Sequence, residues 1–266
     1  MGLFYRGNGI SLLSNSMNLV EVVILNWNGL EFITSCLDSV LANFYQQFIV
    51  TVVDNNSTDG SVELIKKEYP QINLVELDKN YLFSGGYNKY FQAIQLSSPR
   101  YLMLLNNDTI ADKHLIEEFV SAASHYGEDN IYGGKIFYHD QGDRIWYAGG
   151  SINLKRASIK HIGIREIDSP QFSAHVKTDY VTGCCLFTSL NTIQTLNGFD
   201  ESFNMYVEDV DFCIRAKQKG LECYFWPKAK LQHRVSSSMG GNYSLNKIGK
   251  KIRGLGLLLN KHGIKN

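Results

Sequence analysis

Three apolar segments of the chain end in side chains that carry oxygen. Asn26 follows VVIL, Asp54 follows TVV, and NND (residues 106–108) follows LMLL. In an open parallel sheet, ligands bind at the carboxyl ends of the strands. One polar ending is ordinary turn chemistry, but three endings at one sheet edge favour a shared ligand site.

Asp108 is the only carboxylate in NND, beside the amides of Asn106 and Asn107. Mg²⁺ takes oxygen ligands and is usually held by one or two carboxylates together with phosphates. This stretch could therefore hold a divalent metal, Mg²⁺ or Mn²⁺, although a simple Asx-turn would use the same residues.

Glu208, Asp209 and Asp211 open a predicted helix at 208–220. Acids at a helix N-terminus complement the helix dipole, which accounts for one or two of them. Three acids in four residues predict that at least one acts as a general base. Because a helix turns by about 100° per residue, the three cannot all face one site. Geometry leaves Glu208 and Asp209 both possible.

Three other features have competing interpretations. SGGYN (84–88) puts two glycines before a predicted helix, where backbone N–H groups could hold an anion; tight helix–sheet packing is the alternative. His233 follows a short predicted strand, and a lone histidine is more often structural than a ligand. Trp146 could stack on a sugar, although core packing is the commoner role of tryptophan.

Polar strand ends can meet only if a sheet brings them to one edge. Apolar, β-branched runs predict strands at 19–25, 48–54, 72–77 and 100–105, and helical spacing predicts helices at 29–44, 57–69, 84–96 and 112–126. Strands that alternate with helices predict a parallel sheet covered on both faces.

After about residue 128 the pattern changes. Strands are predicted at 131–138, 144–150, 174–190, 222–227 and 230–234, with helices at 208–220 and over the last 22 residues. Residues 151–172 are polar and lack periodicity, so they predict a loop. We expect the two halves to share one sheet, the first binding one ligand and the second completing the site.

Composition excludes some classes of protein. The 266 residues have a formal net charge of zero, unlike the basic footprint of a nucleic-acid-binding protein. No apolar run approaches the ~20 residues of a membrane span, and residues 1–16 make a poor signal peptide. Five cysteines, an odd number without a CxxC pair, are typical of a reduced, cytoplasmic protein.

The order of these motifs resembles that of the family 2 glycosyltransferases, in their rhamnosyltransferase-like branch, which have a GT-A fold. The resemblance covers about residues 19–240. It rests on these stretches, in the family's order: VVILNWNGLEFITSCLDSVL, VTVVDNNSTDGS, KNYLFSGGYNKY, YLMLLNNDT, VTGCCLFTSL, LNGFDESFNMYVEDVDFCIRAKQKG and LQHRVSSS.

The resemblance implies an α/β fold: a Rossmann-like, mostly parallel central sheet with helices on both faces, plus a smaller mixed acceptor-side half. We expect a single GT-A domain at 17–240, with a nucleotide-sugar-binding half at 17–127 and an acceptor and catalytic half at 128–240. Residues 1–16 would be a poorly ordered extension, and residues 241–266 a C-terminal helix.

The resemblance also implies residue roles. NND stands where the family has its metal-binding D-x-D motif, so Asp108 would bind Mg²⁺ or Mn²⁺, and Asn106 is a departure that lowers the site's charge. His233 matches a further metal ligand of some relatives. Asp54 matches a nucleotide-contacting acid, and Asp209 matches the catalytic base of the family's ED motif.

Carried over residue by residue, the implied site has three parts. The expected catalytic acids are Asp209 and Glu208, and the expected acceptor-side residues are Thr182, Gly183 and Trp146. The expected nucleotide-sugar-binding residues are Asn26, Asp54, Asn56, Asn80, Gly85, Gly86, Asn88, Asn106, Asn107 and Asp108. Leu82 stands where relatives usually have glycine, so the loop there is expected to differ in shape.

The implied reaction is inverting transfer of a sugar from a UDP- or dTDP-sugar to a hydroxyl of a glycan or lipid-linked acceptor, in cell-surface polysaccharide synthesis. Two alternatives are a non-catalytic nucleotide-sugar-binding protein and a sugar nucleotidyltransferase. The latter would want a Gly-rich N-terminal loop with a basic residue, which VVILNWNGLEF lacks. Basic and apolar residues in 246–263 suggest peripheral contact with the inner face of the cell membrane.

Overall fold

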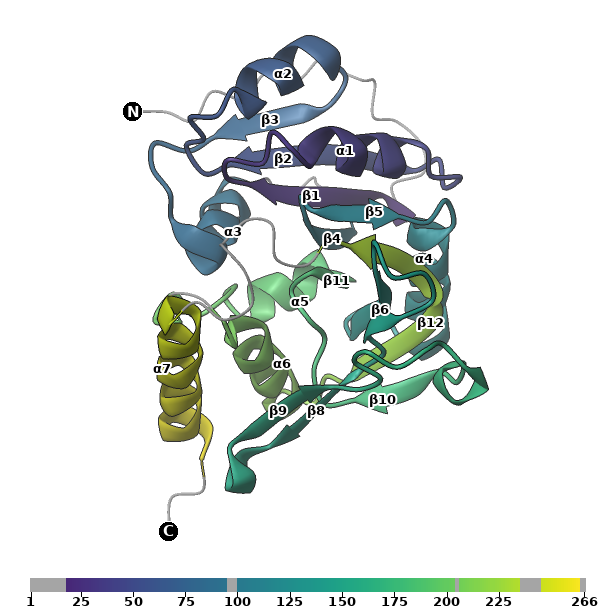
Figure 1. Ribbon diagram of the computed structural model, residues 1–266, viewed down its shortest axis with the longest axis vertical. Coiled ribbons are helices and arrows are strands. Elements are labelled where there is room, and N and C mark those ends of the chain that lie inside the picture. Colours follow the sequence, from purple (N-terminus) through teal and green to yellow (C-terminus); the bar gives the residue numbers. More distant parts are fainter. Residues whose placement is uncertain (1–17, 95–99, 204–205, 235–244, 264–266) are drawn as a thin grey trace.

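The computed structural model describes residues 18–94, 100–203, 206–234 and 245–263, so the predicted extension at 1–16 lies outside the described residues, as does 241–244. One ten-stranded sheet passes through both halves of the chain (Figure 1). Its order is β10-β12-β6-β11-β4-β1-β2-β3, with β5 paired to β12 and β7 paired to β6.

The first half of the chain supplies the parallel part of the sheet. Its strands are β1 (Val20–Asn26), β2 (Phe48–Asp54), β3 (Asn73–Glu76) and β4 (Tyr101–Asn106). β1 lies between β2 and β4, and all but one of its residues are buried. A strand covered on both faces is apolar along its whole length, which is why these strands could be predicted from sequence.

Helices cover both faces of this parallel part, as predicted. They are α1 (Ile33–Leu41), α2 (Ser61–Glu68) and α3 (Leu82–Ala93). Successive residues of a strand point to opposite faces. Asn26 of β1 donates a hydrogen bond to Ser61 of α2, whereas its neighbour Leu25 packs against Gly86 of α3. The two helices therefore lie on opposite sides of the sheet.

The second half of the chain is mixed. Its strands in the main sheet are β5 (Thr109–Ala111), β6 (Ile131–Tyr138), β7 (Ile145–Tyr147), β10 (Val176–Thr178), β11 (Cys185–Ser189) and β12 (Cys223–His233). β11 runs antiparallel between β4 and β6, while β12 runs parallel to β6. α4 (Leu115–Tyr126) packs against β12 and β6, and α5 (Leu190–Thr195) follows β11.

The predicted loop at 151–172 is wrong in part. β8 (Gly150–Asn153) and β9 (Ser158–His161) form an antiparallel hairpin, and short 3-10 helices lie at η2 (Leu154–Arg156) and η3 (Pro170–Phe172). Strands of four residues have too few positions for a clear alternation. The hairpin tip also requires a left-handed residue, Ala157 at φ 48°, for which the sequence has no glycine signal.

Two further strand predictions change. The segment 174–190, predicted as one strand, is divided into β10 and β11 by residues 179–184. The two strands predicted at 222–227 and 230–234 are one strand, β12, whose register shifts between Trp226 and Lys230. Pro227 has no backbone N–H to donate, and such residues are accommodated at bulges. β5 and α5 were not predicted because they are short.

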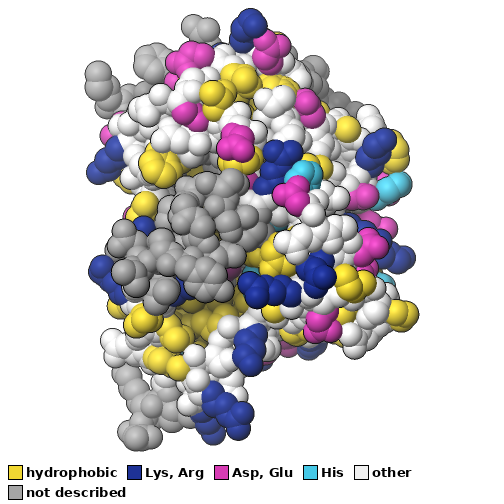
Figure 2. Space-filling view, viewed as in Figure 1, with side chains coloured by type: hydrophobic (Ala, Val, Ile, Leu, Met, Phe, Trp, Pro, Cys, Tyr) yellow, Lys and Arg dark blue, Asp and Glu magenta, His cyan; other side chains and the backbone are white. Residues whose placement is uncertain are grey.

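The surface carries mixed charge. Figure 2 shows Lys and Arg side chains interspersed with Asp and Glu side chains over the face in view. On the β8–β9 hairpin, Lys155, Arg156 and Lys160 are exposed. Among the described helices, none combines the length and apolar character needed to cross a bilayer.

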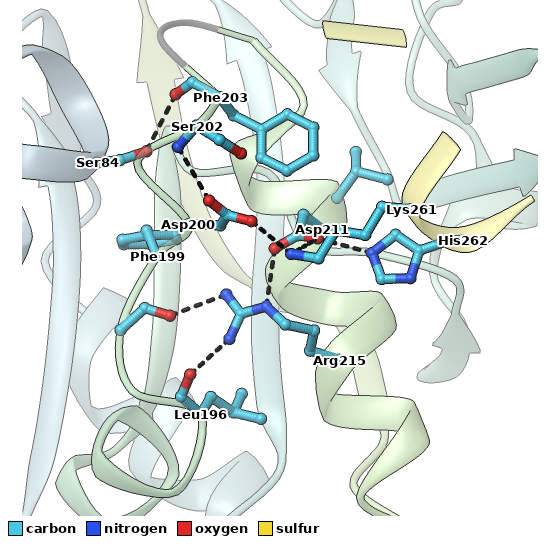
Figure 3. A network of polar contacts seen from close by, with 12 residues as sticks. Ser84, Leu196, Phe199, Asp200, Ser202, Phe203, Asp211, Arg215, Lys261 and His262 are labelled. Atoms are coloured by element: carbon cyan, nitrogen blue, oxygen red, sulfur yellow. Dashed lines mark hydrogen bonds and ion pairs between the residues drawn. The ribbon is translucent and has the colours of Figure 1, made fainter. Parts of the chain in front are cut away.

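A buried ionic network joins α6 (Glu208–Gln218) to α7 (Leu245–His262) (Figure 3). The carboxylate of Asp211 accepts a hydrogen bond from Arg215 Nε at 2.7 Å and lies 2.7 Å from His262 Nε2 and 2.8 Å from Lys261 Nζ. Burial opposes charge on Asp211, but hydrogen bonds from His262, Lys261 and Arg215 lower its pKa.

The same network reaches the segment before α6. The guanidinium of Arg215 donates to the carbonyls of Leu196 and Gly198 at 2.5 and 2.8 Å, and Lys261 Nζ lies 2.6 Å from Asp200. The C-terminal helix, α6 and residues 196–200 are therefore held as one unit. This unit fixes the rotation of α6, which the sequence pattern left open.

We expect Asp211→Ala to destabilise the fold strongly, because it leaves Arg215, Lys261 and His262 around an empty site. Removing one partner of a buried ion pair costs about 3–5 kcal/mol, and partial exposure of Lys261 favours the lower end. Denaturant unfolding gives the measurement. Glu222→Ala, which breaks an exposed pair with Lys177, is the control and should change stability little. Equal effects of the two substitutions would contradict a structural role for the network.

Candidate active site

The ends of β1, β2 and β4 meet through their polar side chains. Asn26 lies opposite Asp54 in the β1–β2 register, and its Nδ2 donates to Asp54 Oδ1 at 2.8 Å. Asn107, just past β4, donates from Nδ2 to Asn26 Oδ1 at 2.7 Å. Three of the predicted site residues are thus brought into one hydrogen-bonded chain.

Asp54 is the buried end of this hydrogen-bonded series of side chains. It is buried, and its carboxylate also accepts hydrogen bonds from the backbone N–H of Ser57 at 2.8 Å and from Ser57 Oγ at 2.6 Å. These bonds fix the start of the β2–α2 connection. A direct contact between Asp54 and a nucleotide stays a prediction.

Gly29 makes the close approach of Asn107 possible. A Cβ atom on Gly29 would lie 2.2 Å from Asn107 Nδ2 and 2.3 Å from Asn26 Oδ1, so any side chain there would displace both amides. Trp27, two residues earlier, exposes 46% of its surface at the end of β1, where a flat aromatic face is available to a ligand. Both residues were missed, although NWNG directly after an apolar run was the available signal.

Strand pairing brings Asp108 and His233 together. β5 starts directly after Asp108 and pairs antiparallel with the end of β12, so that Thr109 lies opposite His233. Asp108 Oδ1 is 3.1 Å from His233 Nε2, and each side chain is only 10% exposed. The backbone N–H of Arg234 also donates to the Asp108 carbonyl at 2.9 Å.

This pair fits a divalent metal as two of its ligands. Apart from its 3.1 Å contact with His233 Nε2, Asp108 Oδ1 has no hydrogen-bond partner in the described part of the chain, and the buried His233 Nδ1 has none there. Such atoms are costly unless something binds them. Within the described residues, no group of three or more His, Cys, Asp or Glu side chains forms a metal cage. The remaining ligands would come from a bound diphosphate and water, which is common for Mg²⁺.

Trp146 lies beside this pair. Its ring centroid is 4.5 Å from that of His233 and 4.5 Å from that of His161, both at 77°. Burial lowers the pKa of His161 to about 4, and its Nδ1 lies 3.1 Å from the carbonyl of Trp146. His161 is therefore neutral at physiological pH. Trp146 thus packs between two imidazoles next to the predicted metal ligands.

One short segment, Gly183–Cys184, joins the metal side to the acids of α6. The carbonyl of Cys184 accepts a hydrogen bond from the backbone N–H of Asn106 at 3.0 Å. The N–H of Gly183 donates to Asp209 Oδ2 at 2.8 Å. Backbone groups of two adjacent residues therefore contact both sides of the site. A Cβ on Gly183 would lie 2.7 Å from the ring of Phe83.

Asp209 and Glu208 have different environments. Burial raises the pKa of Asp209, but the N–H groups of Gly183 and Val210 donate to its carboxylate and oppose that rise. Burial, followed by the charge of Asp209, raises the pKa of Glu208 to about 8. Hydrogen bonds to a carboxylate favour its charged form, so of the two acids Asp209 has the environment that better supports a charge.

The turn before these acids has an unusual backbone. Tyr206 and Val207 are consecutive residues with positive φ, 71° and 65°. Left-handed backbone is costly for a β-branched residue such as Val207 and is found mainly where function requires it. The turn delivers Glu208 and Asp209 to the first turn of α6.

The remaining predicted residues lie elsewhere. Asn88 donates to the carbonyl of Phe199 at 2.8 Å and accepts from its N–H at 2.9 Å, so it ties α3 to the 196–203 segment. Asn80 accepts from the N–H of Leu82 and starts α3. Asn56 is exposed in the β2–α2 connection with φ 62°.

The two glycines have packing roles in this structure. A Cβ on Gly86 would lie 2.7 Å from Leu25 Cδ1 and 2.9 Å from Asn55 Nδ2, and one on Gly85 would lie 3.0 Å from the Cβ of Tyr81. α3 begins at Leu82, with φ 60°, rather than after the glycines. Both glycines are therefore inside the first turns of α3, and Gly86 packs against Leu25 of the sheet. Anion binding there stays a prediction.

Solved structures of glycosyltransferases share this fold. The chain resembles GalNAc-T7 with UDP, GalNAc and Mn²⁺, with a TM-score of 0.71 at 14% identity over 91% of this chain and 48% of that chain. It also resembles the mannosyltransferase PcManGT from Pyrobaculum calidifontis in complex with GDP-Man and Mn²⁺, with a TM-score of 0.60 at 14% identity over 87% and 62%. The predicted GT-A fold is confirmed.

The chain belongs to the family described as "Glycosyl transferase family 2", whose profile matches residues 21–188. It is 25% identical to the O-antigen biosynthesis protein RfbC of Myxococcus xanthus over 78% of this chain and 16% of that protein. It is 22% identical to the N-acetylglucosaminyl-diphospho-decaprenol L-rhamnosyltransferase of Mycobacterium tuberculosis over 72% and 68%. The predicted family and enzyme class are confirmed.

The chain spans only part of several of these relatives, 16% of RfbC and 52% of the glycosyltransferase GlyG of Streptococcus pneumoniae. The substrates of these relatives therefore support only a proposal about the substrates of this chain.

Asp108→Ala should abolish the strengthening of nucleoside diphosphate binding by Mn²⁺, because it removes the only carboxylate of NND. Titration of UDP and dTDP by calorimetry, with and without Mn²⁺, gives the measurement. Asp140→Ala, at an exposed acid, is the control and should retain the full effect of Mn²⁺. Equal strengthening in wild type and Asp108→Ala would show that the metal binds elsewhere.

Proposed function

We propose that this chain transfers a sugar from a nucleoside-diphosphate sugar to a hydroxyl group, with inversion at the anomeric carbon. The observation that carries the proposal is the Gly183–Cys184 segment. Its Gly183 N–H contacts Asp209 and its Cys184 carbonyl contacts Asn106. Through this segment, the residues suited to a diphosphate and the residue suited to a proton lie in one site.

Asp108 and His233 would hold the divalent metal, Mg²⁺ or Mn²⁺. When bound, such a metal neutralises the charge of the leaving diphosphate. The neutral amide of Asn106 in place of an acid lowers the negative charge of the site. The hydrogen-bonded chain Asn107–Asn26–Asp54 fixes the loops around the proposed donor site.

Asp209 would take the proton. As the acceptor oxygen forms its bond to the anomeric carbon, the bond from that carbon to the diphosphate oxygen breaks, and the electron pair leaves with the diphosphate. The acceptor's proton passes to Asp209, whose ionised state is supported by N–H donors from Gly183 and Val210. A single displacement of this kind inverts the carbon and needs no covalent nucleophile.

The names of the relatives support a proposal about the chemical class of the substrates. O-antigen biosynthesis and a rhamnosyltransferase acting on a diphospho-decaprenol acceptor point to glycan or lipid-linked acceptors in cell-surface polysaccharide synthesis. A UDP- or dTDP-sugar is the donor we propose. A non-catalytic nucleotide-sugar-binding protein is the alternative, and it would bind donors without turnover across many acceptors. The nucleotidyltransferase alternative lacks its expected loop.

We propose a cytoplasmic location with peripheral membrane contact through α7. All five cysteines are unpaired and buried, as expected in a reducing compartment. Lys250, Lys251, Ile252 and Arg253 are exposed on α7, whereas Leu258 is buried against the domain. The side chain of Lys247, also part of the predicted basic face, lies outside the described residues.

Asp209→Asn keeps the shape of the side chain and removes the proton acceptor. Sugar transfer should fall by about 10²–10⁴-fold, while nucleotide affinity should change little, because the base addresses the acceptor. Transfer assays and UDP or dTDP titration test both statements, with Asp140→Asn as the control. Near-normal transfer by Asp209→Asn together with an inactive Glu208→Gln would move the base to Glu208.

α7 should bind anionic vesicles weakly at low salt and lose them at high salt, since each basic residue near such a surface contributes about 1 kcal/mol. Co-sedimentation with phosphatidylglycerol vesicles measures this, and neutral vesicles are the control. The triple variant Lys250→Gln, Lys251→Gln, Arg253→Gln should lose the binding. No sedimentation of the wild type at low salt would contradict the membrane proposal.

A further inference from the structure

Glu208 is a buried carboxyl that the mechanism above does not use. It is 7% exposed, and its Oε2 has no hydrogen-bond partner within the part of the chain that the structure describes. An ionised carboxylate in such a place would lose its hydration without compensation. The geometry therefore favours the protonated acid, which carries no charge and can donate one hydrogen bond.

Its neighbour Asp209 has the opposite environment. Burial also raises the pKa of Asp209, but both of its oxygens accept backbone N–H groups, from Gly183 and Val210 at 2.8 Å each. Asp209 has a donor on each carboxylate oxygen, whereas Glu208 Oε2 has none among the described residues, so the two adjacent carboxyls do not ionise equally. When the environments of two neighbouring titratable groups push their pKa values apart, one group can act as the acid and the other as the base.

The groups around Glu208 do not change this assignment. Asp209 lies beside it and its charge opposes a second one, and Tyr206 in the preceding turn also faces Glu208. From the β10–β11 connection Tyr180 faces Asp209. On α7, Lys251 Nζ lies over the ring of Tyr206, 5.3 Å from its centroid. The cation of Lys251 therefore contacts this ring.

We propose that Glu208 acts as an uncharged carboxylic acid that donates a hydrogen bond to a hydroxyl oxygen of the acceptor, while Asp209 accepts the proton from the reacting hydroxyl. This assignment rests on the proposed function. The acceptor is chosen over the donor because Glu208 shares the first turn of α6 with Asp209 and belongs to the same half of the chain as Gly183 and Tyr206. Glu208 keeps its proton throughout, so it holds the acceptor in place beside the base.

The protonation of Glu208 can be tested without turnover. The pKa of the Glu208 carboxyl is about 8 in the native state, against 4.5 for an unperturbed carboxyl. Between these pH values the carboxyl ionises in the unfolded state but not in the native state, so wild-type stability falls as pH rises. Glu208→Gln does not titrate. The Tm of Glu208→Gln relative to wild type should therefore rise by several degrees from pH 5 to pH 8 and then level off.

Glu63→Gln is the matched control for this test. Glu63 is also in the first turn of a helix, α2, but is exposed, so its Tm relative to wild type should not depend on pH over this range. If the Tm difference of Glu208→Gln is equally flat, Glu208 is ionised in the native protein and the proposal is overturned.

Transfer kinetics test the second part of the proposal. Glu208→Gln retains an N–H donor, so its transfer rate at pH 7 should stay within about 10-fold of wild type. Wild-type transfer should fall as pH rises through about 8, where Glu208 loses its proton. This fall should be absent in Glu208→Gln. Glu208→Ala should raise the acceptor KM by about 10-fold or more with unchanged UDP or dTDP affinity.

The outcomes separate this inference from the proposed function. Glu208→Gln as inactive as Asp209→Asn would show that Glu208 must ionise and would overturn the proposal. So would an alkaline fall in transfer that persists in Glu208→Gln. If wild type transfers no sugar from any nucleotide-sugar donor, the proposed function fails, while the Tm series still reports the protonation of Glu208.

Discussion

The antiparallel pairing of β5 with the end of β12 is the contact on which the candidate site depends. It joins β5, from the first half of the chain, to the last residues of β12, from the second half, and sets Thr109 opposite His233. As a result Asp108 faces His233 at 3.1 Å, in a place where both are buried. β5 is only three residues long, whereas its partner β12 is positioned by a longer pairing with β6.

The other half of the site depends on how charge is divided among the acids of α6. Asp211 is matched by Arg215, Lys261 and His262 and holds the helix. Both oxygens of Asp209 accept backbone N–H groups, which favours its charged form, whereas Glu208 Oε2 has no hydrogen-bond partner among the described residues. Three acids in four residues therefore take three different roles, because each meets a different set of partners rather than because they differ in type.

Much of the fold could be predicted because long buried strands such as β1 and β2 leave continuous apolar runs. Short elements could not: the β8–β9 hairpin, β5 and α5 have too few residues to leave a period. Within the site, Asn26, Asp54 and Asp108 were found as polar residues at strand ends. Gly29 was missed because its role depends on how closely Asn107 and Asn26 approach it, and Trp27 because its role depends on the exposure of its side chain. Asn88 was placed by resemblance at the site, yet its amide is used by Phe199.

The central claim is that Asp108 and His233 hold one metal next to the loop whose Gly183 N–H donates to the proposed base, Asp209. The most direct measurement is anomalous diffraction from crystals of this protein with Mn²⁺ and a nucleoside diphosphate. The account predicts a manganese peak within coordination distance, about 2.0–2.5 Å, of both an Asp108 carboxylate oxygen and a His233 imidazole nitrogen. A metal bound to the diphosphate but beyond reach of either side chain would contradict it.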